Sequence, residues 1–128
     1  MKLIAVNGCT LAVEYTVAGG EAGEAVITSV PSTTVLSEGQ GVYRGELGVT
    51  VSGITNSSQG ASTPGPAVVV SIPPTSTKAL IEGSAPLREG DTVSGVAYPL
   101  TTSSPPVAIP TPFTVKITAA GQSSVRCN

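Results

Sequence analysis

The chain has 128 residues, enough for one domain, and 40% of them are apolar, although it contains one Phe, three Tyr and no Trp. A net charge of −2 argues against nucleic-acid binding, which requires a basic stripe, and the positive mean hydropathy argues against a disordered chain. The chain also lacks an apolar run of the roughly 20 residues that a membrane-spanning helix needs. With 15 Gly and 11 Pro, the composition favours a turn-rich β-protein.

The N-terminal residues predict a β-hairpin. An aliphatic run over residues 2–6 ends at Asn7-Gly8, which is a strong hairpin signal. The return strand is expected over residues 10–17, because apolar and polar residues alternate there. Its apolar face comprises Leu11, Val13, Tyr15 and Val17. We therefore expect an N-terminal hairpin over residues 2–17, and the opening apolar run is too short for a secretory signal.

The remaining strands are separated by loops rich in Pro, Gly and Ser. Strands are expected over residues 25–30, 47–53, 67–72, 91–95 and 113–117. Residues 56–66 are expected to form an exposed loop, and residues 100–112 an extended, polyproline-like segment. Because every candidate helix is interrupted by Gly, Pro or β-branched residues, the sequence predicts a single all-β domain over residues 1–128 with no significant helix.

An eleven-residue motif occurs three times, over residues 34–44, 78–88 and 116–126. The gap-free alignment superposes three glycines, a polar residue after each glycine, and a final arginine. These residues are Gly39, Gly83 and Gly121; Gln40, Ser84 and Gln122; and Arg44, Arg88 and Arg126. With their flanking residues, the repeats extend over about 31–53, 73–95 and 111–128.

Each copy of the motif predicts a small hairpin with an arginine at the end of its second strand. A short apolar run is followed by an Xaa-Gly pair, and glycine reaches positive φ without a Cβ penalty. Two interpretations of the arginines remain open. Each can simply extend its charged head into water from a strand end, or the three can ring a pseudo-three-fold axis and meet acidic groups of neighbouring copies or of a partner.

The sequence offers little for catalysis. It contains no histidine, which removes the usual general base and the commonest metal ligand. Glu38 and Glu82 share a repeat position and could act as an acid pair, but a repeated turn residue explains them more simply. Asp91 follows Glu89-Gly90 and is expected to cap a turn rather than to bind an ion. We therefore expect a protein that is not an enzyme.

The two cysteines, Cys9 and Cys127, lie near opposite ends of the chain. Three alternatives remain open: two small buried thiols, a disulfide that joins the ends of a small domain, or metal ligation by the two thiolates alone. The disulfide requires an oxidising setting or late oxidation.

Residues 76–91 resemble the PAAR-like spike-tip proteins of contractile phage tails and type VI secretion systems. The resemblance is carried by an aliphatic strand before Glu82-Gly83, by Ala85-Pro86-Leu87-Arg88 at the position of the Pro-Ala-Ala-Arg motif, and by the following Gly90-Asp91. Residues 33–44 and 116–126 match the same hairpin more loosely.

The resemblance implies a three-sided cone of short hairpins with pseudo-three-fold symmetry. Its base would cap a trimeric β-helical spike, one tip per trimer, and its apex would lead penetration of the target envelope with transient membrane contact. The protein would then be made in the bacterial cytoplasm and become a structural part of a virion or injection particle. Family members commonly hold a metal near the apex through histidines and a cysteine. Since histidine is absent here, that site is not carried over and no cofactor is expected.

Two other classes of protein compete with this interpretation. The first is a virion decoration or tail β-protein that forms its own trimer. The second is an extracellular carbohydrate-binding or adhesin module, which the scarcity of aromatic side chains disfavours.

Overall fold

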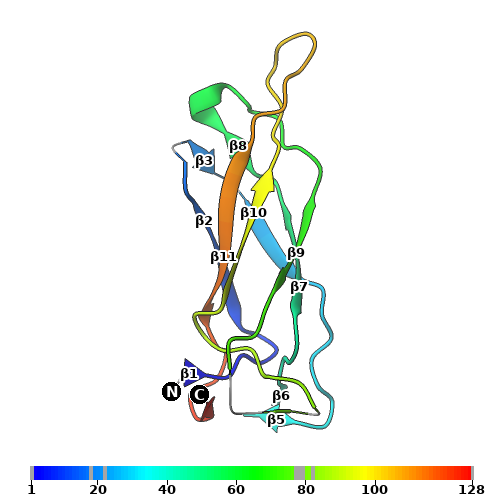
Figure 1. Ribbon diagram of the computed structural model, residues 1–128, viewed down its shortest axis with the longest axis vertical. Helices are drawn as coiled ribbons and strands as arrows, with labels where there is room; N and C mark the ends of the chain where they lie inside the picture. The colour runs from blue at the N-terminus through cyan, green and yellow to red at the C-terminus, as the bar shows by residue number, and fades with distance from the viewer. Residues whose placement is uncertain (1, 18, 22, 77–79, 82, 128) are drawn as a thin grey trace.

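Figure 1 shows the computed structural model, which describes residues 2–17, 19–21, 23–76, 80–81 and 83–127, with only the backbone of Cys127. These residues form β-strands and turns, together with one 3-10 helix, η1 (Ser57–Gln59). The predicted all-β class without a significant helix is confirmed.

Two three-stranded antiparallel sheets form the body of the molecule. The first has the order β10-β11-β2 and contains β2 (Thr10–Tyr15), β10 (Thr92–Ala97) and β11 (Thr111–Ala119). The second has the order β4-β7-β9 and contains β4 (Glu24–Ile27), β7 (Leu47–Ser52) and β9 (Val68–Ile72). The six strands run along the long axis of the molecule (Figure 1).

The two sheets pack face to face and follow a simple order. β2 contacts β4, and β9 contacts β10, across the two seams where the sheets meet. Passing around the body, the strands therefore occur as β2, β4, β7, β9, β10 and β11, which is their order in the chain. The fold is an up-and-down meander that returns to its first strand through the β11–β2 pair.

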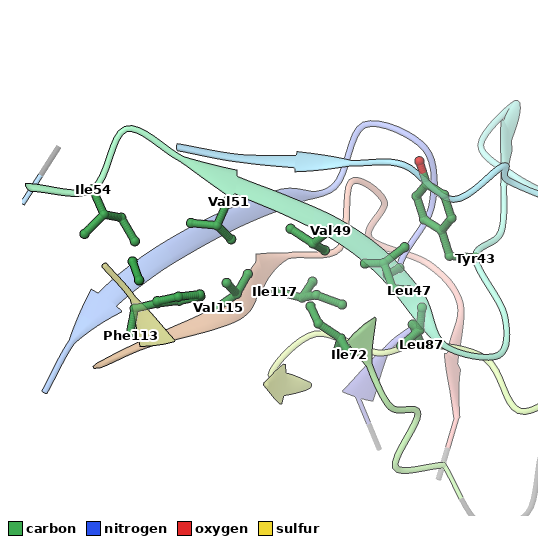
Figure 2. Close-up of a cluster of buried hydrophobic side chains, with 12 residues drawn as sticks. Tyr43, Leu47, Val49, Val51, Ile54, Ile72, Leu87, Phe113, Val115 and Ile117 are labelled. Carbon is green, nitrogen blue, oxygen red and sulfur yellow. The ribbon is translucent and has the colours of Figure 1, made fainter. Parts of the chain in front are cut away.

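The core lies between the inner faces of the sheets. In β7 and β11 every second residue is buried, the period of a strand with one covered face. Figure 2 shows the inner side chains of β7 facing those of β11. These residues are Leu47, Val49 and Val51, opposite Phe113, Val115 and Ile117. Phe113 is 1% exposed, so its predicted position in the core is confirmed.

The N-terminal hairpin predicted over residues 2–17 is not formed. Asn7-Gly8 does reverse the chain, because Cys9 N donates to Val6 O at 2.9 Å. However, β1 (Lys2–Leu3) pairs with β12 (Arg126–Cys127), whereas β2 pairs with β11. The turn signal was correct, but its flanking strands find distant partners.

The expected loops lie at the end of the molecule that is at the top in Figure 1. There β3 (Gly20–Glu21) pairs with β8 (Thr55–Asn56), and Asn56 caps η1 by accepting a hydrogen bond from Gln59 N. The Pro-rich segment between β10 and β11 projects beyond this end (Figure 1), and Leu100 forms bridges with Thr63 and Ala108.

The structure does not confirm the pseudo-three-fold cone. The long strands belong to two sheets of three, and the third repeat contributes its first residues, 116–119, to β11 of the central body. What the three eleven-residue copies share, apart from residues 116–119 in β11, is their location at the end opposite the Pro-rich loop (Figure 1).

Candidate functional site at the repeat end

The repeat end comprises the described residues of segments 2–9, 30–46, 73–91 and 120–127, at the bottom of Figure 1. It contains the turn glycines and the terminal arginines of the repeats. We describe it as the candidate site because the sequence motifs converge there.

The first two copies of the motif form tight hairpins, as predicted. β5 (Leu36–Ser37) and β6 (Gln40–Gly41) are joined by Glu38 (φ 52°) and Gly39 (φ 81°). Two consecutive positive φ angles are typical of a type I′ turn, which matches the twist of the flanking strands. In the second copy, Ile81 and Ser84 exchange two backbone hydrogen bonds of 2.7 and 3.0 Å around Gly83.

The third copy departs from the predicted hairpin, because its second half pairs with β1 instead of with β11. Gly121 has the expected positive φ of 85°. Beyond it, the Gln122 side chain organises the turn: Nε2 donates to Ile4 O (2.9 Å) and Val125 O (2.7 Å), while Oε1 accepts from Ser124 N and Val125 N. Gln122 is 7% exposed. Its buried amide group therefore provides hydrogen bonds to backbone groups that a closed hairpin would otherwise have paired.

All three copies form hydrogen bonds with the same short N-terminal segment, residues 5–7. Successive backbone N–H groups of that segment donate to a different copy each. These bonds are Ala5 N to Leu87 O (2.8 Å), Val6 N to Ala120 O (3.0 Å) and Asn7 N to Gly41 O (2.8 Å). The repeats are therefore assembled around one strand-like segment, although they are far apart in the sequence.

A small apolar cluster supports this junction, separate from the main core. Ile4, Val6 and Val42 are buried together, and the partly buried Val35 and Ile81 pack against them. The cluster combines the N-terminal segment with the apolar positions of the first and second copies.

The three repeat arginines all lie in backbone bridges at this end. Arg44 is opposite Pro86, Arg88 is opposite Ile4, and Arg126 is opposite Leu3. The predicted ring of arginines around a pseudo-three-fold axis is not tested by these pairings and stays a prediction.

Asp91 caps a turn, as the sequence predicts. It is buried, its Oδ2 accepts from Arg88 N (2.9 Å), and its backbone N–H donates to Arg88 O (3.1 Å). Thr75 links the two charged side chains, since its hydroxyl donates to Asp91 Oδ1 and accepts from Arg88 Nη2 (2.7 Å). The Arg-Glu-Gly-Asp turn of the second copy is thereby fixed by Thr75, a contact that no motif indicated.

Glu38 ties the first copy to the third. Its Oε2 accepts from Ser123 N (2.7 Å) and Ser124 Oγ (3.1 Å). The hydrogen bond from Ser123 N, followed by that from the Ser124 hydroxyl, lowers the pKa of the Glu38 carboxyl. Its partner in the considered acid pair, Glu82, lies outside the described residues. Glu38 therefore has a structural role that explains its charge.

The residues present do not fit the metal site of the PAAR-like family. The chain has no histidine, and no group of three Cys, Asp or Glu side chains among the described residues is arranged to hold a metal ion. Burial raises the pKa of the Cys9 thiol, which disfavours the thiolate that a metal requires.

The predicted disulfide between Cys9 and Cys127 stays a prediction. Cys9 is a half-buried free cysteine, and the side chain of Cys127 lies outside the described atoms. The β1–β12 pair does bring the two ends of the described chain side by side (Figure 1).

Comparison with protein-family models, with curated proteins and with solved structures gives no match, so nothing about function is carried over from a relative. In the described ranges, no helix has the length and apolar character needed to cross a bilayer.

The sequence motifs did not predict three features of this end: the roles of Gln122 and Thr75, and the contact between Glu38 and Ser123. Gln122 left a trace in the sequence, because a polar residue follows the repeat glycine in every copy. The other two depend on tertiary contacts between separate segments.

Proposed function

We propose that this chain is a structural, non-enzymatic spike-tip protein of the PAAR-like type. One copy would cap a trimeric β-helical spike at the centre of a contractile tail or injection baseplate and help it to pierce the target cell envelope. The partners would be the trimeric spike, one tip per trimer, and transiently the target membrane. The protein would act as a component of the virion or injection particle.

The observation that carries this proposal is the junction of the three repeat copies on residues 5–7. The second copy contains the residues that resemble the family motif; its Pro86 and Leu87 are fully buried, and the Leu87 side chain packs in the main core. Ala5 N bonds to Leu87 O, and Leu87 N bonds to Tyr43 O (3.2 Å), so the motif is built into the framework of the end instead of lying on a loop.

The mechanical demands of a tip are consistent with this framework. A body driven through an envelope must resist deformation, and short turns held by backbone hydrogen bonds and buried aliphatic side chains provide that resistance. A cap with three similar segments also meets a three-fold partner with little mismatch of symmetry. Within each sheet the long strands are hydrogen-bonded to their neighbours, and the edge strands of the two sheets meet at the seams. Strands of the spike would therefore pair with the short segments at an end of the molecule.

The experiment is a stoichiometry measurement. The purified chain is mixed with a trimeric β-helical spike protein of a contractile system and analysed by size-exclusion chromatography with light scattering. We expect a complex of one chain per spike trimer. As a variant, Leu36→Asp places a charge on the surface of the repeat end, where Leu36 is 56% exposed, and should abolish the complex. Val107→Asp, in the Pro-rich loop at the opposite end and 52% exposed, is the matched control.

A second candidate, a decoration or tail β-protein that forms its own trimer, is favoured by one observation. Val26, Thr50 and Val69 form a row across the outer face of the β4-β7-β9 sheet, with Val26 59% and Val69 73% exposed. An apolar row on a nearly uncharged sheet face suits contact between copies. A stable homotrimer in the same light-scattering experiment, dissociated by Val69→Asp, would support this function instead.

A further inference from the structure

A groove of about 460 Å³ lies where the two ends of the described chain meet. β1 and β12 form one side, the lower half of β11 forms the other, and the turn at Glu89-Gly90 closes it. The turn is held in place from both sides, because Glu89 N donates to Leu3 O and Gly90 N donates to Ile117 O, both at 2.8 Å.

The groove collects positive charge in an acidic protein. Of the six Lys and Arg residues in the chain, three line it: Lys2, Lys116 and Arg126. Among the described lining residues Glu89 is the one acid, so these residues carry a formal charge of +2 while the whole chain carries −2. Gly90 makes room for one of the cations, since a Cβ at this position would lie 3.2 Å from Lys2 Nζ.

The three cations of the lining have no charged partner among the residues that the structure describes. Considering the described part of the chain only, Lys2, Lys116 and Arg126 form no ion pair and no side-chain hydrogen bond, although Glu89 lines the same groove. Three like charges that line one concave surface repel each other, and an anion bound among them relieves that repulsion.

We propose that this groove is an anion site for a phosphomonoester group. Such a group carries about −1.5 to −2 charges at neutral pH and offers three acceptor oxygens, which match the net charge and the three donors of the lining. The half-buried Leu3 adds an apolar side chain to the lining, whereas the Ile117 side chain faces the core. The group can come from free phosphate or from a lipid headgroup. The site does not depend on the spike-tip function.

The first test is a titration of the ¹⁵N-labelled chain with sodium phosphate against sodium chloride of the same ionic strength at neutral pH. We expect saturable shifts of the amide signals of Lys2, Glu89, Lys116 and Arg126. Lys116→Gln and Arg126→Gln should each weaken the binding about tenfold, the size expected for the loss of a charge-assisted hydrogen bond. Both are surface changes, and an otherwise unchanged amide spectrum shows that the variants are folded.

Two matched variants separate the site from the overall charge. Glu89→Gln removes the acid of the groove and should tighten phosphate binding. Glu21→Gln, in β3 at the opposite end, changes the net charge equally and should leave binding unchanged. Equal tightening in both variants, or shifts that do not saturate, would overturn the proposal.

The second arm identifies the source of the phosphate. The chain is sedimented with phosphatidylcholine vesicles that do or do not contain phosphatidic acid, with Lys116→Gln as the control. Binding that requires phosphatidic acid and Lys116 supports a lipid headgroup as the source, and phosphate binding without vesicle binding supports free phosphate. Failure of both probes contradicts the site and leaves the spike-tip proposal untouched.

Discussion

At the scale of single residues, the repeat glycines have the same backbone conformation but different surroundings. A Cβ at Gly39 would meet nothing within 4 Å, whereas a Cβ at Gly121 would lie 3.0 Å from Cys9 N and 3.1 Å from Gly8 C. Both glycines have positive φ, which costs an L-residue about 1–2 kcal/mol. Only Gly121 adds a steric requirement, where the third copy packs on the Asn7-Gly8 turn.

This difference predicts unequal effects of the same substitution. Gly39→Ala should lower the free energy of unfolding by about 1–2 kcal/mol, and Gly121→Ala should cost clearly more, because backbone atoms must also move. Urea unfolding followed by circular dichroism measures both. Equal losses would show that the contact between Gly121 and the N-terminal turn contributes nothing.

Glu38 makes the repeat end sensitive to acid. Since its pKa is lowered in the folded state, its contribution to stability is present above the unfolded pKa, near 4.5, and is lost as the pH falls through the folded value. The wild-type chain should therefore be more stable than Glu38→Gln at neutral pH, and this advantage should shrink in acid.

Urea midpoints of both proteins across this pH range test the Glu38 contact. Ser124→Ala removes one of the two donor residues and should reduce the same pH-dependent advantage in part. A constant difference between wild type and Glu38→Gln at every pH would contradict the role of the carboxylate.

At the scale of elements, the burial pattern of the β4-β7-β9 sheet assigns opposite faces to neighbouring valines. Val49 on β7 is fully buried, while Val69 on β9 is 73% exposed. Val49→Thr should destabilise the protein by about 1–3 kcal/mol, because it buries a hydroxyl in an apolar core. Val69→Thr, the same change on the outer face, should stay within about 0.5 kcal/mol.

Thermal or urea unfolding of this Val→Thr pair tests the assignment of the faces. If the two variants lose stability equally, the sheet is covered on both faces or its register is shifted by one residue.

The strands themselves were largely predictable, because alternation records which residues face the core. Leu11, Val13 and Tyr15 pack on the core as expected, and Phe113 to Ile117 form the centre of β11. Val17 was wrongly placed on that face, because β2 ends at Tyr15 and Val17 is 38% exposed. Strand pairing was less predictable. Asn7-Gly8 encodes a reversal of the chain, but nothing local encodes that residues 5–7 bond to segments more than thirty residues away.

The repeats show the same limit. The motif correctly predicted three glycines with positive φ and two hairpins. The third copy diverged because its apolar run, residues 115–117, has Leu11, Val13 and the β10 strand as neighbours and is absorbed into the long β11. Similar motifs therefore specify similar turns, whereas contacts with other strands determine whether the two halves of a motif pair as a hairpin.

At the scale of the whole molecule, the two ends differ in character. The end opposite the repeats carries the projecting Pro-rich loop, whereas the repeat end brings together the N-terminal segment, the three copies and the cationic groove (Figure 1). Binding of a phosphomonoester in that groove, weakened by Lys116→Gln and strengthened by Glu89→Gln, is the prediction for this end that does not depend on a protein partner.

The most direct test of the spike-tip proposal is the mass of the chain by light scattering, alone and with a trimeric β-helical spike. We predict a monomer that joins the spike trimer in a ratio of one to three. A stable homotrimer with no affinity for the spike would contradict the proposal and favour a self-assembling decoration or tail protein.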